Sequence, residues 1–567
     1  MLNKLYTTEG EALWDIPWET YPRPQMRRKS YVNLNGIWEL TVVGEAEPFK
    51  IRVPFCPESL LSGVNRHFSE GDTLSYRRKF TLPKDFNKGR VLLHIGAADQ
   101  ITEVYVNQKF VGRHEGGYTA FSFDITDALN AENLLEIRCT DNLYDLSFPY
   151  GKQALKRGGM WYTPVSGIWQ SVWLESVPTS YIENLRIENH GYGVHITITP
   201  AINGLVNVDG VGEFPLIEGK AVIEPENPQL WSPENPYLYN FRITAGEDCV
   251  ESYFAIRTIE SRTINGIPRL CLNGKPYFFH GLLDQGYWPD GIYTPATPKC
   301  YTDDILSMKK LGFNTLRKHI KVEAEEFYYQ CDKLGMIVFQ DMVNNGDYSF
   351  IRDTAIPTLR IQKCGDTRMH KDKKTRERFL LNMEQTVSQL QNHPCILYWT
   401  VFNEGWGQFD SDKVYKKLRT LDNTRIIDTT SGWFRRKKSD VESLHIYFGP
   451  WNQIRPCEKP IILSEFGGYT YPVAKHLFNT DKAYGYKTCK SESEFQNQLI
   501  ALYRNKVLPA IKKGLCGAIY TQVSDVEDEI NGLLTYDRKV CKADEKAMTD
   551  LSAELHKQLS ESCKHKS

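Results

Sequence analysis

Hydrophobic and polar residues alternate along the first 180 residues of the chain. In "LEIRCTD" the apolar side chains of Leu135, Ile137 and Cys139 fall on one face of a strand and polar side chains fall on the other. "EVYVNQKFVG" has the pattern of a hairpin that turns near Asn107. Because such runs follow one another without helical periodicity, we predict an N-terminal jelly-roll β-sandwich over residues 1–180.

A second β-rich segment extends over residues 181–264. The runs "VHITITP", "KAVIEP" and "YNFRITA" alternate in the same way, and the proline-rich stretch "EPENPQLWSPENPY" separates two of them. With about 80 residues, the segment has the size of a small immunoglobulin-like β-sandwich, which we predict here. Neither β-rich segment contains an evident nucleophile, metal cluster or phosphate-binding loop.

Beyond residue 265 the pattern changes to short apolar runs that alternate with amphipathic stretches. "TDDILSMKKLG" has apolar residues at helical spacing, with Thr302 as the expected N-cap and Gly312 as the expected stop. Eight apolar runs lie between such stretches: "YFFHGLL", "NTLRKHI", "GMIVFQDM", "ILYWTVFNE", "RIIDTTSG", "SLHIYFG", "PIILSEFGG" and "GAIYTQVSD". This alternation predicts a C-terminal (β/α)8 TIM barrel over residues 265–567.

Polar residues stand where these apolar runs end. In a TIM barrel the carboxyl ends of all strands meet at one mouth, so we expect these side chains to surround a single pocket. The set comprises Arg317, His319, Asp341, Asn403, Glu404, His445, Tyr447, Glu465 and Gln522.

Two glutamates of this set carry candidate chemistry. Glu404 ends the fourth run and Glu465 ends the seventh. Two carboxyl groups that face one pocket are the minimal machinery of glycoside hydrolysis, provided that one holds a proton and the other stays ionised. Two solvated loop glutamates are the alternative, but the neighbouring Asn403, Tyr447 and Arg317 favour the catalytic interpretation.

Charge and composition bear on the partners, the cellular location and the cofactors that we expect. The chain has 69 Lys and Arg against 70 Asp and Glu, a formal charge of −1, so we expect no nucleic-acid partner and no membrane partner. No apolar segment follows the first residues, and 13 cysteines lack metal-ligand spacing. We therefore expect a cytoplasmic protein with reduced thiols, no bound metal and no other cofactor.

Several motifs together resemble glycoside hydrolase family 2, the β-galactosidase and β-glucuronidase group. In the barrel these are "GFNTLRKHI", "NHPCILYWTVFNEGWG" and "PIILSEFGG"; upstream they include "LNGIWEL", "SGIWQSVWLE" and "LWSPENPYLY". The resemblance covers nearly the whole chain. It implies an exo-acting hydrolase of β-glycosides that works with retention through double displacement, a carbohydrate substrate, and a homo-oligomer as a common form.

The resemblance also implies residue roles. Glu404 matches the general acid/base and Glu465 the nucleophile that forms a glycosyl-enzyme. Arg317 matches the arginine that supports the nucleophile, Tyr447 the tyrosine that hydrogen-bonds it, and Asn403 the side chain that binds the sugar 2-hydroxyl. For a retaining enzyme we expect the two carboxyl groups to lie about 5–5.5 Å apart, not roughly 6.5–9.5 Å apart as in inverting enzymes.

Sugar-contacting positions depart from the family's common pattern. Many relatives carry a His-Glu pair after the first strand, where this chain reads "HGLLDQGYWPDG" and offers Gln285. The Asn-x-Lys of glucuronidases is missing from the acidic stretch "DVEDEINGLLTYDRK". We therefore expect a neutral sugar, such as a β-galactoside; the alternative is a β-glucuronide, for which Lys318 or Lys321 would supply the positive charge.

Other interpretations stay open at the sequence level. His319 and His445 are either substrate contacts or packed histidines, and Trp433 and Trp406 are either sugar platforms or packing. The acidic stretch would suit a cation, although no ligand spacing requires one. A catalytically silent carbohydrate-binding protein is the alternative from another class; it predicts that one of the two carboxylates is lost or sealed from solvent.

Overall fold

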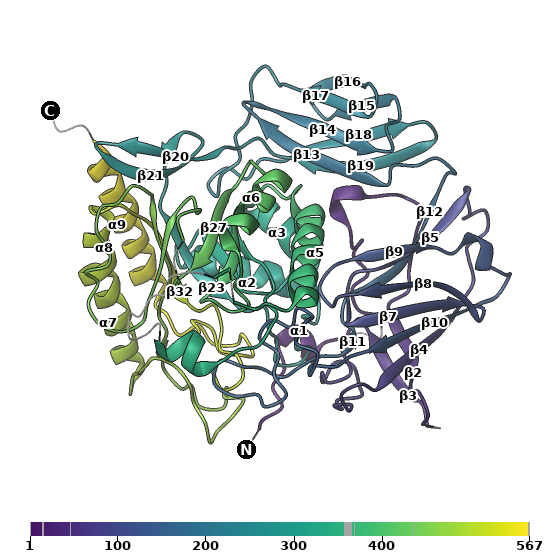
Figure 1. Cartoon of the computed structure of the whole chain (residues 1–567), viewed down its shortest axis with the longest axis horizontal. Coiled ribbons are helices and arrows are strands. Elements are labelled where there is room, and N and C mark those ends of the chain that lie inside the picture. The colour runs from purple at the N-terminus through teal and green to yellow at the C-terminus, as the bar shows by residue number, and fades with distance from the viewer. Residues whose placement is uncertain are drawn as a thin grey trace.

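The computed structural model describes residues 2–13, 16–45, 47–356, 366–367, 369–434 and 436–564. Figure 1 shows a β-sandwich on the right, a smaller β-sandwich at the top and a barrel with its helices on the left. The predicted combination of a jelly roll, an immunoglobulin-like sandwich and a TIM barrel is confirmed. No helix in the described ranges combines the length and the apolar character that crossing a membrane requires.

Two antiparallel sheets form the N-terminal jelly roll, with the strand orders β1-β12-β5-β9 and β3-β2-β4-β10-β7-β8. Leu135, Ile137 and Cys139 of β10 are buried between the sheets, as their alternation predicts. The predicted hairpin joins β7 to β8 at Asn107 and Gln108. The strands are β1 Tyr31–Asn33, β2 Gly36–Val42, β3 Phe49–Val53, β4 Thr73–Phe80, β5 Arg90–Ile95, β6 Ala98–Asp99, β7 Ile101–Val106, β8 Lys109–Glu115, β9 Phe121–Asp124, β10 Asn133–Thr140, β11 Gly167–Ile168 and β12 Val172–Val177.

The second β-sandwich packs a three-stranded sheet, β13-β14-β17, against a four-stranded sheet, β16-β15-β18-β19. Its core consists of the inward-facing apolar residues of both sheets, such as Ile196 and Ile243. The strands are β13 Asn184–His190, β14 Gly193–Thr199, β15 Gly204–Val208, β16 Gly212–Leu216, β17 Lys220–Ile223, β18 Tyr239–Ala245 and β19 Asp248–Phe254.

A hairpin connects this sandwich to the barrel. It consists of β20 (Ile259–Ile264) and β21 (Ile267–Leu272) and is extended by β22 (Lys275–Pro276). The guanidinium of Arg269 donates to the carbonyl of Leu515, where the last barrel strand begins. The hairpin therefore covers the end of the barrel opposite the carboxyl ends of its strands.

The barrel contains the eight predicted strands, all parallel, in the order β27-β26-β25-β24-β23-β32-β29-β28, with β28 beside β27. Side chains of these strands are almost completely buried, which explains their continuous apolar runs. The strands are β23 Phe279–Asp284, β24 Thr315–Lys318, β25 Ile337–Asp341, β26 Ile396–Asn403, β27 Ile426–Ser431, β28 Glu442–Ile446, β29 Ile461–Gly467 and β32 Leu515–Thr521.

Helices surround the barrel, and one predicted helix start is wrong. Helix α2 begins at Lys299 after Pro298, three residues before the expected N-cap Thr302, because proline suits the first turn of a helix. Gly312 follows its last turn with a positive φ, as predicted. The helices are α1 Thr8–Glu11, α2 Lys299–Lys310, α3 Glu325–Leu334, α5 Lys373–Leu390, α6 Ser411–Leu421, α7 Glu492–Leu502, α8 Leu508–Ile511 and α9 Glu545–Cys563.

Short segments complete the described elements. They are the 3₁₀ turns Pro24–Met26 and Thr126–Ala128, the π-helical turns Phe350–Ala355 and Tyr503–Val507, and the strands β30 Tyr469–Thr470 and β31 Lys487–Thr488.

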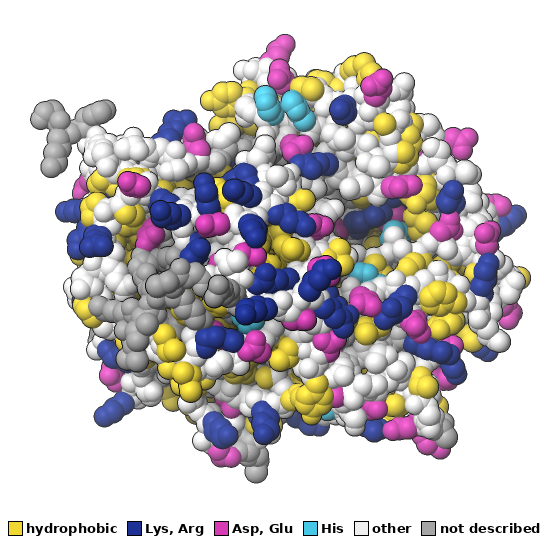
Figure 2. Space-filling model, in the orientation of Figure 1, with side chains coloured by type: hydrophobic (Ala, Val, Ile, Leu, Met, Phe, Trp, Pro, Cys, Tyr) yellow, Lys and Arg dark blue, Asp and Glu magenta, His cyan; other side chains and the backbone are white. Residues whose placement is uncertain are grey.

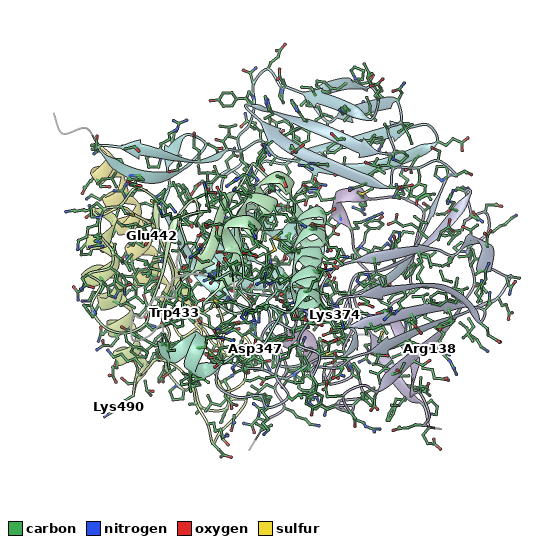
Figure 3. The ribbon with its side chains drawn as sticks, in the orientation of Figure 1. Arg138, Asp347, Lys374, Trp433, Glu442 and Lys490 are labelled. Atoms are coloured by element: carbon green, nitrogen blue, oxygen red, sulfur yellow. The ribbon has the colours of Figure 1, made fainter. Side chains whose placement is uncertain are left out.

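The jelly roll docks on the barrel beside helix α5. Arg378 of α5 forms ion pairs with Glu115 (2.8 Å) and Asp145 (3.1 Å) of the jelly roll, and Lys374 lies at the same seam (Figure 3). Figure 2 shows the basic side chains over α5 and α6 interspersed with acidic ones. This docking brings jelly-roll residues 147–166 to the mouth of the barrel.

Candidate active site

The carboxyl ends of five barrel strands bring most of the predicted site residues together. Arg317 lies in β24, Asp341 ends β25, Asn403 ends β26, His445 lies in β28 and Glu465 lies in β29. His319, Glu404 and Tyr447 follow directly after β24, β26 and β28. All of these side chains are connected by the contacts described below, so the strand ends form one cluster.

Glu465 is surrounded by hydrogen-bond donors. Arg317 NH1 donates to its Oε1 at 3.0 Å and the Tyr447 hydroxyl donates to its Oε2 at 2.6 Å. Burial alone would raise the pKa of Glu465, but the neighbouring His445 and Arg317 and the hydrogen bond from Tyr447 hold it at about 2. Glu465 is therefore ionised at every pH near neutrality.

Arg317 connects the cluster. Its Nε donates to Asp341 Oδ1 at 3.0 Å, its NH2 donates to Asn403 Oδ1 at 2.9 Å, and its NH1 reaches Glu465. His319 Nδ1 lies 2.8 Å from Asp341 Oδ2. Each nitrogen of the guanidinium already donates to an acceptor. Arg317 therefore fixes the positions of its neighbours and has little hydrogen-bonding capacity left for a substrate.

Glu404 has a different partner. His445 Nδ1 lies 2.7 Å from Glu404 Oε1, while His445 Nε2 faces Arg317 NH1 at 3.3 Å and the Ser431 hydroxyl at 2.8 Å. Since an arginine N–H can only donate, Nε2 acts as an acceptor and the imidazole proton lies on Nδ1, where it is donated to Glu404. The other carboxyl oxygen of Glu404 has no hydrogen-bond partner among the described residues.

The two carboxylates lie close together. One oxygen of Glu404, one oxygen of Glu465 and a ring nitrogen of His445 lie within 4.8 Å of one another. Such a triad also has the residue types of a metal site, but the guanidinium of Arg317 on Glu465 would repel a cation there. The side chains of Glu404 and Glu465 keep 9% and 6% of their surface exposed, so neither is sealed from solvent.

Three residues that were predicted to contact the substrate lie outside this hydrogen-bonded cluster. Trp433 packs against His445 with ring centroids 6.2 Å apart and belongs to the barrel loops in Figure 3. Gln522 follows β32 and donates to Asn531 Oδ1 at 2.8 Å. Gln285 follows β23 and is buried; no contact between its side chain and the cluster is seen among the described residues.

Both candidate sources of charge for an acidic sugar are already paired. Lys321 donates to the carbonyls of Gly286 and Tyr293 and to Glu323. Lys318 forms ion pairs with Asp284 (2.6 Å) and Glu323 (3.0 Å). In this structure the two lysines named for the β-glucuronide alternative thus have partners within the protein.

Sequence reasoning missed the part of the site that comes from the jelly roll. Lys152 lies over the rings of Trp406 (4.7 Å) and Trp161 (5.9 Å), and the two tryptophans stack at 5.3 Å. The Tyr162 hydroxyl donates to Glu529 Oε2 at 2.5 Å. No signal in the barrel pattern identifies Lys152, Trp161 and Tyr162, because they reach the barrel only through domain docking.

Comparisons with known proteins agree with this architecture. The model "Glycosyl hydrolase 2 galactose-binding domain-like" matches residues 62–147 and "Glycosyl hydrolases family 2" matches residues 180–257. A β-galactosidase of Thermoanaerobacter pseudethanolicus is 26% identical over 440 residues, 71% of this chain and 54% of that protein. A β-glucuronidase of Chlorocebus aethiops is 25% identical over 472 residues, 70% of this chain and 69% of that protein.

A solved structure shares the fold over almost the whole chain. The β-D-glucuronidase of Dictyoglomus thermophilum aligns with a TM-score of 0.74 and 22% identity, covering 95% of this chain and 98% of that one. The chain spans about half the length of the Thermoanaerobacter relative. The model "Glycosyl hydrolases family 2, TIM barrel domain" matches residues 267–557, just over half of the chain. The chain therefore belongs to glycosyl hydrolases family 2.

Proposed function

We propose that the protein is a retaining, exo-acting β-glycosidase that acts by double displacement on a neutral sugar, with Glu465 as nucleophile and Glu404 as general acid/base. The observation that carries this proposal is the approach of the two carboxylates to within 4.8 Å, with Arg317 and Tyr447 hydrogen-bonded to Glu465. This separation agrees with the short distance of retaining enzymes and leaves no room for a water between carboxylate and sugar.

In the first step an oxygen of Glu465 attacks the anomeric carbon of the sugar. The bond to the leaving oxygen breaks, and Glu404 transfers its proton to that oxygen, so that an alcohol leaves and a glycosyl ester remains on Glu465. Glu404 is then a carboxylate, and the N–H of His445 on its Oε1 stabilises the new charge.

In the second step Glu404 acts as the base. It takes a proton from water, the water oxygen attacks the anomeric carbon, and the ester bond to Glu465 breaks. The sugar leaves with its original configuration, Glu404 is protonated again, and Glu465 returns to the ion that Arg317 and Tyr447 favour.

The preference for a neutral sugar rests on charge around the pocket. Lys318 and Lys321 are paired inside the protein, and Arg317 is occupied by Asp341, Glu465 and Asn403. The second candidate is a β-glucuronide, because the Chlorocebus relative is named a β-glucuronidase. A uronate would face the ionised Glu465 without a compensating cation from these three residues.

A panel of nitrophenyl glycosides tests the proposal. It contains the β-galactoside, β-glucoside, β-xyloside, β-glucuronide and β-galacturonide, and hydrolysis is followed by nitrophenolate release and by NMR of the first-formed anomer. We expect cleavage of a neutral β-glycoside with retained configuration. Glu465→Gln should lose at least about 10³-fold in kcat, as removal of a nucleophile does.

The acid/base role has its own signature. Glu404→Ala should keep much of its first-step rate on dinitrophenyl glycosides, whose leaving groups need little protonation, and lose it on methyl or alkyl glycosides. An active Glu465→Gln enzyme, or product of inverted configuration, would rule out the double displacement.

A further inference from the structure

Lys152 is a jelly-roll residue whose side chain reaches the loops at the mouth of the barrel. The residue as a whole is only 7% exposed. Its Nζ stands over Trp406, two residues beyond Glu404, and lies in the electrostatic field of Glu529, Glu465 and Glu404. A lysine from another domain therefore lies beside the loop that carries Glu404 and Trp406.

The segment that carries Lys152 is held on both sides. The Tyr150 amide donates to the carbonyl of Asn344 and its hydroxyl donates to the carbonyl of Gly346, both in the loop after β25. On the other side, the Gln153 side-chain oxygen accepts from the Val165 amide at 2.7 Å. The backbone of Lys152 is thus fixed against the barrel, and the position of its side chain is a built feature.

No hydrogen-bond acceptor contacts the Lys152 ammonium within the described part of the chain. Other buried lysines are satisfied: Lys321 has three acceptors, and Lys542 donates to Asp525 and to the carbonyl of Ile530. Burial of the residue lowers the pKa of Lys152, but its Nζ is not among the side-chain atoms that are cut off from solvent without a partner. An ammonium that keeps this access and has no protein acceptor is free to donate to another molecule.

Glu529 provides the complementary charge. It is 2% exposed and anchored by the Tyr162 hydroxyl on Oε2 and by Asn531 Nδ2 on Oε1 at 2.9 Å. A carboxylate with one donor on each oxygen can accept further hydrogen bonds. Tyr162, whose hydroxyl holds Glu529, also donates its amide to the carbonyl of Lys152 at 3.0 Å. Lys152 and Glu529 therefore offer a donor and an acceptor at the same part of the barrel mouth.

We propose that Lys152 is a substrate-contacting specificity residue, which donates to a hydroxyl of the terminal sugar while Glu529 accepts from a hydroxyl of the same sugar. The inference rests on the proposed function, because it assigns the substrate class of that site. A hydroxyl satisfies both groups, since it accepts from the ammonium and donates to the carboxylate. A sugar carboxylate satisfies only Lys152 and is repelled by Glu529 and Glu465, so the pair selects neutral sugars.

The test compares Lys152→Met and Lys152→Arg with wild type on the neutral nitrophenyl β-glycoside that wild type cleaves best. Lys156→Met is the matched control, because Lys156 lies in the same segment but is exposed. We expect kcat/KM to fall roughly 10- to 100-fold in Lys152→Met, the loss typical of one charged hydrogen bond, with partial recovery in Lys152→Arg. Lys156→Met should match wild type.

Two further readouts separate a binding role from a structural one. A singly deoxygenated substrate that lacks the contacted hydroxyl should be cleaved equally by wild type and Lys152→Met, because the interaction is already absent. The thermal midpoint of Lys152→Met should equal that of wild type, since the substitution removes no hydrogen bond of the ammonium to the described part of the protein. The proposal would be overturned if Lys152→Met had a lowered thermal midpoint and lost the same factor in kcat/KM on every deoxy substrate. It would also be overturned if kcat/KM of Lys152→Met on the full substrate stayed within threefold of wild type.

Failure of the inference can be told from failure of the proposed function. If wild type cleaves β-glycosides with retention but prefers a uronide, and Lys152→Met loses only that activity, the hydroxyl assignment is overturned and the hydrolase stands. Binding of the free monosaccharides, followed by saturation-transfer NMR, needs no turnover. Lys152-dependent binding of a neutral sugar without hydrolysis would support the inference and refute the glycosidase, whereas binding that ignores Lys152 would overturn it.

Discussion

Glu404 and Glu465 are the same residue type in one pocket, yet their partners differ. Glu465 accepts from Arg317 and Tyr447, both of which favour its ionised form. Glu404 accepts from His445, whose proton position is set by Arg317 on the other ring nitrogen. Different surroundings thus distinguish two identical side chains, as the proposed double displacement requires of a nucleophile and a proton donor.

Tyr447→Phe tests how Glu465 is kept ionised. Loss of the hydroxyl removes a hydrogen bond to a charged carboxylate, so the pKa of Glu465 should rise from about 2 by roughly one to two units. The acid limb of kcat/KM against pH, which follows the nucleophile in the free enzyme, should then move to higher pH by the same amount. Tyr415→Phe on α6, whose hydroxyl bonds Asp440 outside the pocket, is the control. An unmoved acid limb in Tyr447→Phe contradicts this account.

At the scale of elements, the strand ends could be predicted and the docked segment could not. Arg317, Asn403 and Glu465 each close a buried apolar run, and parallel barrel strands bring such ends to one mouth whatever their separation in sequence. The position of Lys152 near Glu529 does not follow from strand order, because it depends on how the jelly roll packs on the barrel. Thr302 failed as a helix start because Pro298, four residues earlier, could begin the helix.

Gly151→Ala tests whether the docked segment completes the pocket. Gly151 has φ +65°, and a Cβ there would lie 3.0 Å from the carbonyl oxygen of Ile320 and 3.0 Å from the hydroxyl of Tyr118. The segment must shift to relieve this contact, so kcat/KM should fall about tenfold or more through a displaced Lys152. Gly63→Ala is the control, since φ is +81° but nothing lies within 4 Å of its Cβ. It should lose a similar amount of thermal stability and keep its activity; equal activity in both variants would contradict the prediction.

For the whole molecule, a buried charge network fixes the jelly roll to the immunoglobulin-like sandwich. Arg28 pairs with Glu175 of β12 at 3.0 Å and with Asp248 of β19 at 2.7 Å, and Arg23 adds a second contact to Glu175 at 2.9 Å. Burial alone would raise the pKa of Glu175, but Arg23, His94 and Arg28 hold it far below its ordinary value. Glu175 therefore contributes stability above its unfolded pKa of about 4.3, and this contribution is lost as the pH falls toward the folded pKa.

Arg28→Met should destabilise the protein by about 3–5 kcal/mol at pH 7, because it leaves Glu175 short of one partner and Asp248 without its guanidinium. In the variant the folded pKa of Glu175 rises, so its carboxylate takes up a proton at a higher pH than in wild type and the unpaired charge is relieved. The difference in thermal midpoint between wild type and variant should consequently be largest near neutral pH and shrink below about pH 4. Calorimetry at pH 7 and pH 3.5 measures both values, with the exposed Arg27→Met as control. A difference that stays constant or grows on acidification would show that the domains are held together by packing, with the charge network contributing little.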